Sequence, residues 1–158
     1  MITIITGSIN SGKTTKLLEL YERTHEGDGL ILPKVFQNGQ NIGQMIRKLS
    51  TGDQIPFSIR KQYLSDDWDE IYNYKDYSFS KRGLEYASLI INEISEKHIS
   101  PVFLDEIGPL ELEEKGFSTL LTGLLGRELT LYLTVRESYL SQVINHFHIE
   151  ANEILNLR

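Results

Sequence analysis

Cysteine is absent from this chain of 158 residues, so disulfide bonds and thiolate metal sites are excluded. A chain without cysteine suits a reducing compartment, and we expect a cytoplasmic location. No apolar run approaches the ~20 residues that a membrane-spanning helix needs. The first residues also lack the basic and apolar regions of a secretory signal. We therefore expect no association with a membrane.

Positive charge is also scarce, because 16 Lys and Arg residues stand against 22 Asp and Glu and leave a net charge of −6. Proteins that bind nucleic-acid backbones usually carry a basic surplus, so DNA and RNA are not expected as partners. Hydrophobic residues, in contrast, make up 40% of the chain, enough for one core. The length predicts a single domain over residues 1–158.

Short apolar runs alternate along the chain with segments of helical spacing. This alternation predicts an α/β domain with a mostly parallel sheet and right-handed crossovers. Ser80 has the character of a helix N-cap, and Gly27 and Gly29 are expected to end the first helix. We expect strands at residues 1–6, 30–32, 101–104, 129–135 and 149–155, and helices at residues 13–26, 81–97, 117–125 and 139–147.

Residues 33–79 break this alternation. Short apolar runs joined by Gly-containing turns predict an antiparallel, partly irregular insertion within the same domain, since the segment is too short to hold a good core alone. Within it, residues 66–77 (DDWDEIYNYKDY) combine acidic and aromatic side chains, and their pattern defines no element. We expect its aromatic residues to close a small satellite core in preference to stacking on a base: Trp68, Tyr72, Tyr74 and Tyr77.

The stretch GSINSGKTT, residues 7–15, follows the first apolar run and contains the full pattern G-x-x-x-x-G-K-[ST] of a phosphate-binding loop. Glycines allow a sharp turn in which successive N–H groups point inward, and the helix that opens at Lys13 adds its positive end. Lys13 is predicted to pair with the β- and γ-phosphates, and the Thr14 hydroxyl to ligate Mg²⁺. The predicted nucleotide-binding residues are Gly7, Ser8, Ile9, Asn10, Ser11, Gly12, Lys13, Thr14 and Thr15.

A second motif, PVFLDEIGPLEL, places two acids at the end of an apolar strand. In phosphate-loop proteins the second carboxylate that organises Mg²⁺ lies in this position, so Asp105 is predicted to hold the metal through a coordinated water. Glu106 is expected one residue beyond the strand end, where it can polarise a water in line with the γ-phosphorus. It is the predicted catalytic base.

With both motifs in hand, the chain resembles the small P-loop nucleoside triphosphatases of the cancer-related/thermophilic type. Residues 29–57, from GLILPKVF to DQIPF, are similar to the strand-turn-strand insertion of that family. The resemblance implies a three-layer, RecA-like α/β fold, an extra strand between the loop strand and the acidic strand, and Mg²⁺-dependent hydrolysis of several nucleoside triphosphates. One departure is that Ser8-Ile9-Asn10-Ser11 stand where the family loop usually has Pro-Gly.

Arg136, after the run LTLYLTV, has two interpretations: a catalytic cation on the γ-phosphate, or a solvated arginine at a strand end. The late strands carry no Asn-Lys-x-Asp guanine signature, so weak base selectivity is expected. Three functions stay open: hydrolysis of ATP, GTP and other nucleoside triphosphates; a nucleoside or small-molecule kinase; and a nucleotide switch that acts on a protein partner.

Overall fold

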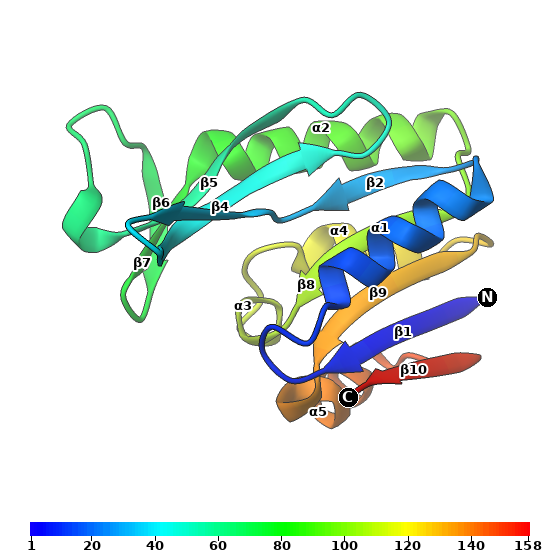
Figure 1. The fold of residues 1–158 in the computed structure, drawn as a ribbon. Helices are drawn as coiled ribbons and strands as arrows, with labels where there is room; N and C mark the ends of the chain where they lie inside the picture. Colours follow the sequence, from blue (N-terminus) through cyan, green and yellow to red (C-terminus); the bar gives the residue numbers. More distant parts are fainter.

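All strands of the chain join one ten-stranded sheet, which the computed structural model describes over residues 1–158 (Figure 1). Across the sheet the order is β10 (Glu153–Leu157), β1 (Ile2–Gly7), β9 (Leu131–Arg136), β8 (Val102–Ile107), β2 (Asp28–Ile31), β4 (Gln40–Lys48), β5 (Gln54–Arg60), β7 (Tyr77–Ser80) and β6 (Glu70–Tyr74), with β3 (Lys34–Gln37) paired to β4.

The first five strands of this order, β10 to β2, are all parallel. Strand β9 lies between β1 and β8, where the family resemblance places the extra strand, and β10 forms the edge. Several predicted bounds were wrong. Gly29 lies inside β2 and does not end the first helix, and the last strand begins at Glu153. Strand β8 runs on to Ile107, so Asp105 and Glu106 belong to it.

Helices cover both faces of the parallel strands, which gives the three-layer arrangement (Figure 1). Helix α1 (Lys13–Thr24) contacts one face, and α2 (Lys81–Glu96) packs on the other, where α4 (Ser118–Leu125) contacts it. As predicted, Ser80 caps α2, with the Gly83 N–H donating to its hydroxyl at 3.1 Å. No helix combines the length and the apolar character that crossing a bilayer requires. The remaining helical segments are α3 (Pro109–Leu112), α5 (Leu140–Phe147), and the 3₁₀ turns η1 (Lys61–Tyr63) and η2 (Glu137–Tyr139).

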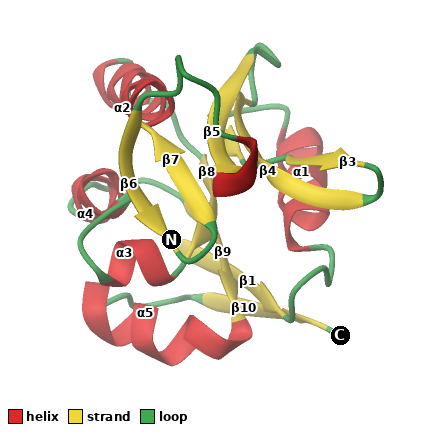
Figure 2. Ribbon diagram, turned by 90° about the vertical axis from the view of Figure 1, so that its left-hand side faces the viewer, coloured by secondary structure: helices red, strands yellow, loops and turns green.

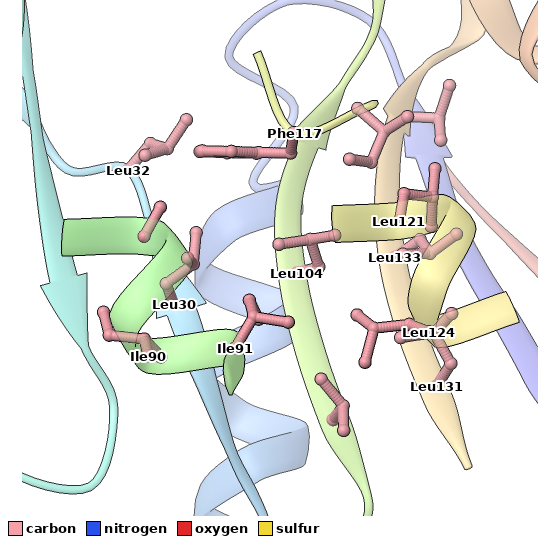
Figure 3. Close-up of a cluster of buried hydrophobic side chains, with 14 of the residues drawn as sticks. Leu30, Leu32, Ile90, Ile91, Leu104, Phe117, Leu121, Leu124, Leu131 and Leu133 are labelled. Atoms are coloured by element: carbon pink, nitrogen blue, oxygen red, sulfur yellow. The ribbon is translucent and has the colours of Figure 1, made fainter. Parts of the chain in front are cut away.

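The hydrophobic core is divided by the sheet into two clusters. Because successive strand residues face opposite sides, Ile4 joins the large cluster under α2, α4 and α5, whereas Ile5 joins the small one under α1. Leu104 and Phe103 divide in the same way. Figure 3 shows the large cluster, where side chains from β2, β8 and β9 meet those of α2 and α4. Strands β1 and β8 are buried on both faces, which explains why their sequences are almost continuously apolar.

Residues 33–79 form the antiparallel strands β3 to β7, as predicted, and extend the same sheet beyond β2 (Figure 2). Residues 66–77, whose pattern defined no element, contain β6 and the start of β7. The expected satellite core was wrong: Tyr72, Tyr74 and Tyr77 pack against the large cluster. The reason is that the extension shares one continuous sheet, so its inner face joins the main core.

Candidate nucleotide-binding and catalytic site

The loop between β1 and α1 has the backbone geometry of an anion-binding nest. Gly12 precedes α1 with φ 93°, a left-handed conformation that favours glycine, and it gives α1 no side-chain cap. The first N–H groups of the helix are therefore free to bind a ligand. Gly7 is favoured by lack of space, because a Cβ there would lie 2.9 Å from the backbone oxygen of Leu157. Backbone conformation therefore explains the glycine at position 12, and close packing explains the glycine at position 7.

Two polar groups of the loop point to an anionic ligand. Lys13 Nζ donates to the Ser8 carbonyl at 2.6 Å, so the ammonium lies across the loop, and burial lowers the pKa of Lys13. The buried Ser11 hydroxyl has no hydrogen-bond partner in the protein. A buried polar atom without a partner costs free energy, and a phosphate oxygen would supply that partner. The sequence motif and the geometry of the loop therefore both favour a phosphate group as the ligand.

Asp105 connects the loop to the sheet. Its carboxylate is fully buried and accepts hydrogen bonds from the Thr14 hydroxyl at 2.9 Å, the Leu32 N–H at 3.1 Å and the Thr134 hydroxyl at 2.6 Å. These donors come from α1, the end of β2, and β9. Such a network fixes the orientation of the carboxylate. Asp105 and Thr14, predicted to share a metal, are thus neighbours.

Glu106 occupies an irregular position in β8. The pairing of β8 with β9 shifts register between Leu104 and Ile107, and Glu106 has φ 56°, which is uncommon for a non-glycine residue. Its N–H donates to the Thr134 hydroxyl at 2.7 Å, the same hydroxyl that bonds Asp105. Strand irregularities re-aim side chains next to active sites. Glu106 was predicted beyond the strand; instead, a bulge inside the strand directs it.

The Glu106 side chain is half-buried and lies beside a second carboxylate. Burial and the neighbouring charge of Asp105 raise its pKa to about 7, whereas the Gln44 amide donates to Oε2 and favours the charged form. A carboxylate with a pKa near neutrality suits a general base. Gln44 comes from β4, in the antiparallel extension, and Ser58 Oγ on β5 donates to its amide oxygen at 3.4 Å.

Two cations flank the loop and the acids. Arg136 stands beside Gly7 in the pairing of β1 and β9, and its guanidinium lies 5.7 Å from the Tyr139 ring centre. Lys34, from β3, donates to the side chain of Asn10 in the loop. Both cations act electrostatically on Lys13 and on Glu106. The site therefore combines positive charge for a polyphosphate with a carboxylate that can accept a proton.

The residues predicted from the two motifs come together at the carboxyl ends of β1, β8 and β9. Ser8, Ile9, Asn10, Gly12 and Thr15 are the exposed members of the predicted loop set. Sequence reasoning missed Gln44, Lys34 and Thr134. A buried threonine in the otherwise apolar β9 was a usable signal for Thr134. No such signal exists in the sequence for Gln44 or Lys34, because these residues reach the site only through the folding of the antiparallel extension.

The oxygen atoms at this site fit a hard divalent cation. The Thr14 hydroxyl and the Asp105 carboxylate are oxygen donors of the kind that Mg²⁺ prefers. The structure contains no cluster of three or more His, Cys, Asp or Glu residues that could hold a metal by itself. Mg²⁺ usually keeps waters and completes its coordination with substrate phosphates. These two residues would therefore hold it only together with a nucleotide.

The glycine-rich loop after β1, the adjacent acids on β8 and the parallel sheet between helix layers together define a three-layer P-loop nucleoside-triphosphate-binding protein. The sequence profile of a family described as NTPase matches residues 2–157. The chain therefore belongs to the NTPase family, and it is an enzyme of the nucleoside-triphosphate phosphatase class.

Individual relatives agree with this assignment. The chain is 25% identical over 155 residues to the nucleoside-triphosphatase THEP1 of Archaeoglobus fulgidus, covering 94% of this chain and 87% of that protein. The crystal structure of THEP1 from the hyperthermophile Aquifex aeolicus matches with a TM-score of 0.76 at 20% identity, over 99% of this chain and 90% of that one. The solution structure of a human cancer-related nucleoside triphosphatase matches with a TM-score of 0.65, also at 20% identity, over 98% and 87%. Both solved structures support the fold.

Proposed function

We propose that the protein hydrolyses nucleoside 5′-triphosphates, ATP and GTP among them, to the diphosphate and phosphate with Mg²⁺, and that Glu106 activates the water. One observation carries the proposal. The Thr134 hydroxyl bonds both the Asp105 carboxylate and the Glu106 N–H, so a metal-binding acid and a proton-accepting acid are held in one network beside the phosphate loop.

Binding of the polyphosphate rests on the loop between β1 and α1. Its free N–H groups and the Lys13 ammonium neutralise the β- and γ-phosphates, and the Ser11 hydroxyl gains a partner. Thr14 and Asp105 would hold Mg²⁺. When bound, the ion neutralises charge on the phosphate oxygens.

Glu106 would accept a proton from the attacking water. The water oxygen then forms a bond to the γ-phosphorus while the bond from that phosphorus to the bridging oxygen breaks, and the electron pair leaves with the nucleoside diphosphate. Arg136 and Lys34 would stabilise the charge that spreads over the transferring group. A cytoplasmic setting, as the absence of cysteine suggests, would supply both substrates and Mg²⁺.

The proposal includes several nucleotides because no Asn-Lys-x-Asp guanine signature is present in the sequence. We expect similar rates with ATP, GTP, CTP and UTP, and mutual competition between them. A strong preference for one base in competition assays would contradict this part of the proposal.

Phosphate release with ATP and Mg²⁺ is the decisive measurement, run over long incubations because loop hydrolases without a supplied arginine can turn over at roughly 10⁻⁴ to 10⁻² per second. Glu106→Gln should lower turnover by roughly 10²- to 10⁴-fold while nucleotide binding by calorimetry is retained. Glu113→Gln, on the exposed face of the following turn, is the matched control. Full turnover in Glu106→Gln would remove the base assignment.

Lys13→Ala tests the binding half of the proposal. Removal of the ammonium should abolish most nucleotide uptake, because Lys13 is the cation within the loop that would pair with the β- and γ-phosphates. Nucleotide uptake and turnover at the level of the unaltered protein would overturn the phosphate-binding assignment.

A further inference from the structure

A cavity of about 500 Å³ lies in the antiparallel extension, outside the phosphate loop. It is formed by β4, β5 and the loop that follows η1, which Figure 2 shows alongside them. Its volume is within the range of small-molecule sites, and such sites combine apolar walls with a few polar groups. Its apolar lining consists of Val35, Ile42, Met45, Ile55, Pro56, Ile59 and Trp68.

Gln44 belongs to both the cavity and the catalytic site. It lines the cavity, and its amide donates to the Glu106 carboxylate. Ser58, which donates to the Gln44 amide oxygen, also lines the cavity. A molecule in the cavity is therefore separated from the catalytic carboxylate by a single side chain. A second hollow, around Met1 and Arg127, lies at the amino ends of β1 and β9, away from these acids.

The polar groups of the cavity favour an uncharged ligand over a phosphorylated one. Two carboxylates and one guanidinium line it. Asp69 is satisfied, because it accepts from the Ser80 hydroxyl at 2.7 Å and from the Arg82 N–H at 2.7 Å and Nε at 3.2 Å. Asp67 is exposed and accepts only from Ser65 among side chains. With Arg82 already paired, no free cation is left to neutralise a phosphate.

Trp68 gives the cavity a fixed aromatic surface. Its indole N–H donates to Ser78 Oγ at 2.9 Å, which holds the ring against β7. A ring held in this way can stack on a planar ligand without loss of its own freedom. The lining therefore suits a planar, neutral ligand of moderate size, and Gln44 joins this cavity to the carboxylate that we propose as the base.

We propose that this cavity binds a nucleoside, and that the nucleoside hydroxyl can replace water as the acceptor of the γ-phosphoryl group. The inference rests on the proposed function, since it uses the same phosphate loop and the same base. The hydroxyl proton passes to the Glu106 carboxylate, and the hydroxyl oxygen bonds to the γ-phosphorus. The bond from that phosphorus to the bridging oxygen breaks, its electron pair leaving with the nucleoside diphosphate. The product is a nucleoside monophosphate. Because it is an anion, Asp67 and Asp69 in the cavity lining disfavour its binding.

Binding is measured first, through the protein's own fluorescence. Trp68 is the sole tryptophan of the chain and lines the cavity, so excitation of tryptophan reports on this site alone. Adenosine, guanosine, cytidine, uridine and thymidine, each at millimolar concentration and without ATP, are the probes. At least one should change the emission saturably. No saturable change with any of the five would overturn the inference.

Transfer is measured second, with ATP labelled at the γ-phosphate, Mg²⁺ and the bound nucleoside. Labelled nucleoside monophosphate and free phosphate are separated and counted in the same reaction. Label on the nucleoside supports the inference. Free phosphate with no labelled nucleotide overturns the acceptor role and leaves the proposed function standing. If neither product forms, the proposed function fails as well.

Ile59→Phe fills the cavity without touching the loop or the acids, and Ile71→Phe, on the exposed strand β6, is the matched control. Ile59→Phe should lower labelled nucleotide by about tenfold or more and change free phosphate by less than about twofold. Ile71→Phe should change neither. Equal loss of both products in Ile59→Phe, with its thermal unfolding unaltered, would contradict a separate acceptor site. If Ile59→Phe does not fold, the fluorescence titration of the unaltered protein decides.

Discussion

The Thr14 hydroxyl donates to Asp105 Oδ2 across 2.9 Å, although the two residues are 91 positions apart in the chain. This bond joins the first turn of α1 to strand β8 and brings two side-chain oxygens together beside the phosphate loop. It is the geometric reason to expect that metal and nucleotide bind together.

Thr14→Val tests this pair, because valine keeps the shape of threonine and removes the hydroxyl. We expect turnover at limiting Mg²⁺ to fall by roughly 10- to 100-fold, since the hydroxyl that we propose as a metal ligand is lost. Thr14→Ser keeps a hydroxyl and should retain most activity. The measurement is phosphate release titrated with MgCl₂. Equal Mg²⁺ dependence in the valine and serine variants would contradict the ligand role of Thr14.

The pKa of Glu106, raised to about 7, predicts the pH dependence of catalysis. A general base acts in its deprotonated form, so kcat/KM should rise with pH through roughly 7 and level off above it. Gln44→Ala removes a donor that favours the charged carboxylate. The pKa of Glu106 should therefore rise further, and the ascending limb should move to higher pH.

The pH profile is measured at saturating Mg²⁺ for the unaltered protein, for Gln44→Ala and for Gln62→Ala. Gln62 lies exposed in η1 and serves as the control, with no expected effect. A limb that stays in place in Gln44→Ala, or that moves to lower pH, would contradict the link between the two side chains.

Arg136→Ala should lower kcat by about tenfold or more with a smaller change in KM, because a cation beside the transferring group stabilises charge that develops in the transition state. The kcat of Arg136→Lys should lie between those of the unaltered protein and of Arg136→Ala. Arg23→Ala, at the exposed end of α1, removes the same charge away from the site. Steady-state kinetics of the three variants decide between the two interpretations of Arg136. Identical behaviour of Arg136→Ala and Arg23→Ala would identify a solvated strand-end residue.

Glu111 predicts a pH dependence of stability. Its side chain is 3% exposed and accepts from the Gly108 N–H at 2.7 Å and the Phe117 N–H at 2.9 Å. Burial raises its pKa to about 7 despite these bonds. The folded pKa lies above the ordinary value of ~4.3, so the folded state binds the proton more tightly. Its contribution to stability is full below that value and is lost as pH rises through about 7.

Glu111→Gln isolates this contribution, because the amide does not titrate. The free energy of unfolding of the unaltered protein, minus that of the variant, should fall by up to about 3 kcal/mol between roughly pH 5 and pH 8. Denaturant unfolding at several pH values gives this difference. A difference that stays constant, or that increases with pH, would contradict the proton uptake assigned to Glu111.

Local sequence was sufficient for most of the site and for the parallel half of the fold. The spacing of Gly7, Gly12, Lys13 and Thr14 dictates a turn into a helix, and its chemistry follows from backbone geometry. The apolar run before Asp105 requires a strand buried on both faces. The sequence predicted that residues 33–79 form antiparallel strands. It did not predict the strands within residues 66–77, because charged residues interrupt the alternation of apolar and polar residues there.

The sequence by itself determined the phosphate loop, the pair of acids and the alternation of strands and helices that predicts a mostly parallel sheet, because each depends on neighbouring residues and on short-range backbone preferences. Only the tertiary structure decided what Glu106 contacts. A bulge in β8 turns its carboxylate, and β4, far away in the chain, brings Gln44 against it. Pairing between distant strands has no local signal, since the register that joins them is set by packing over the whole sheet.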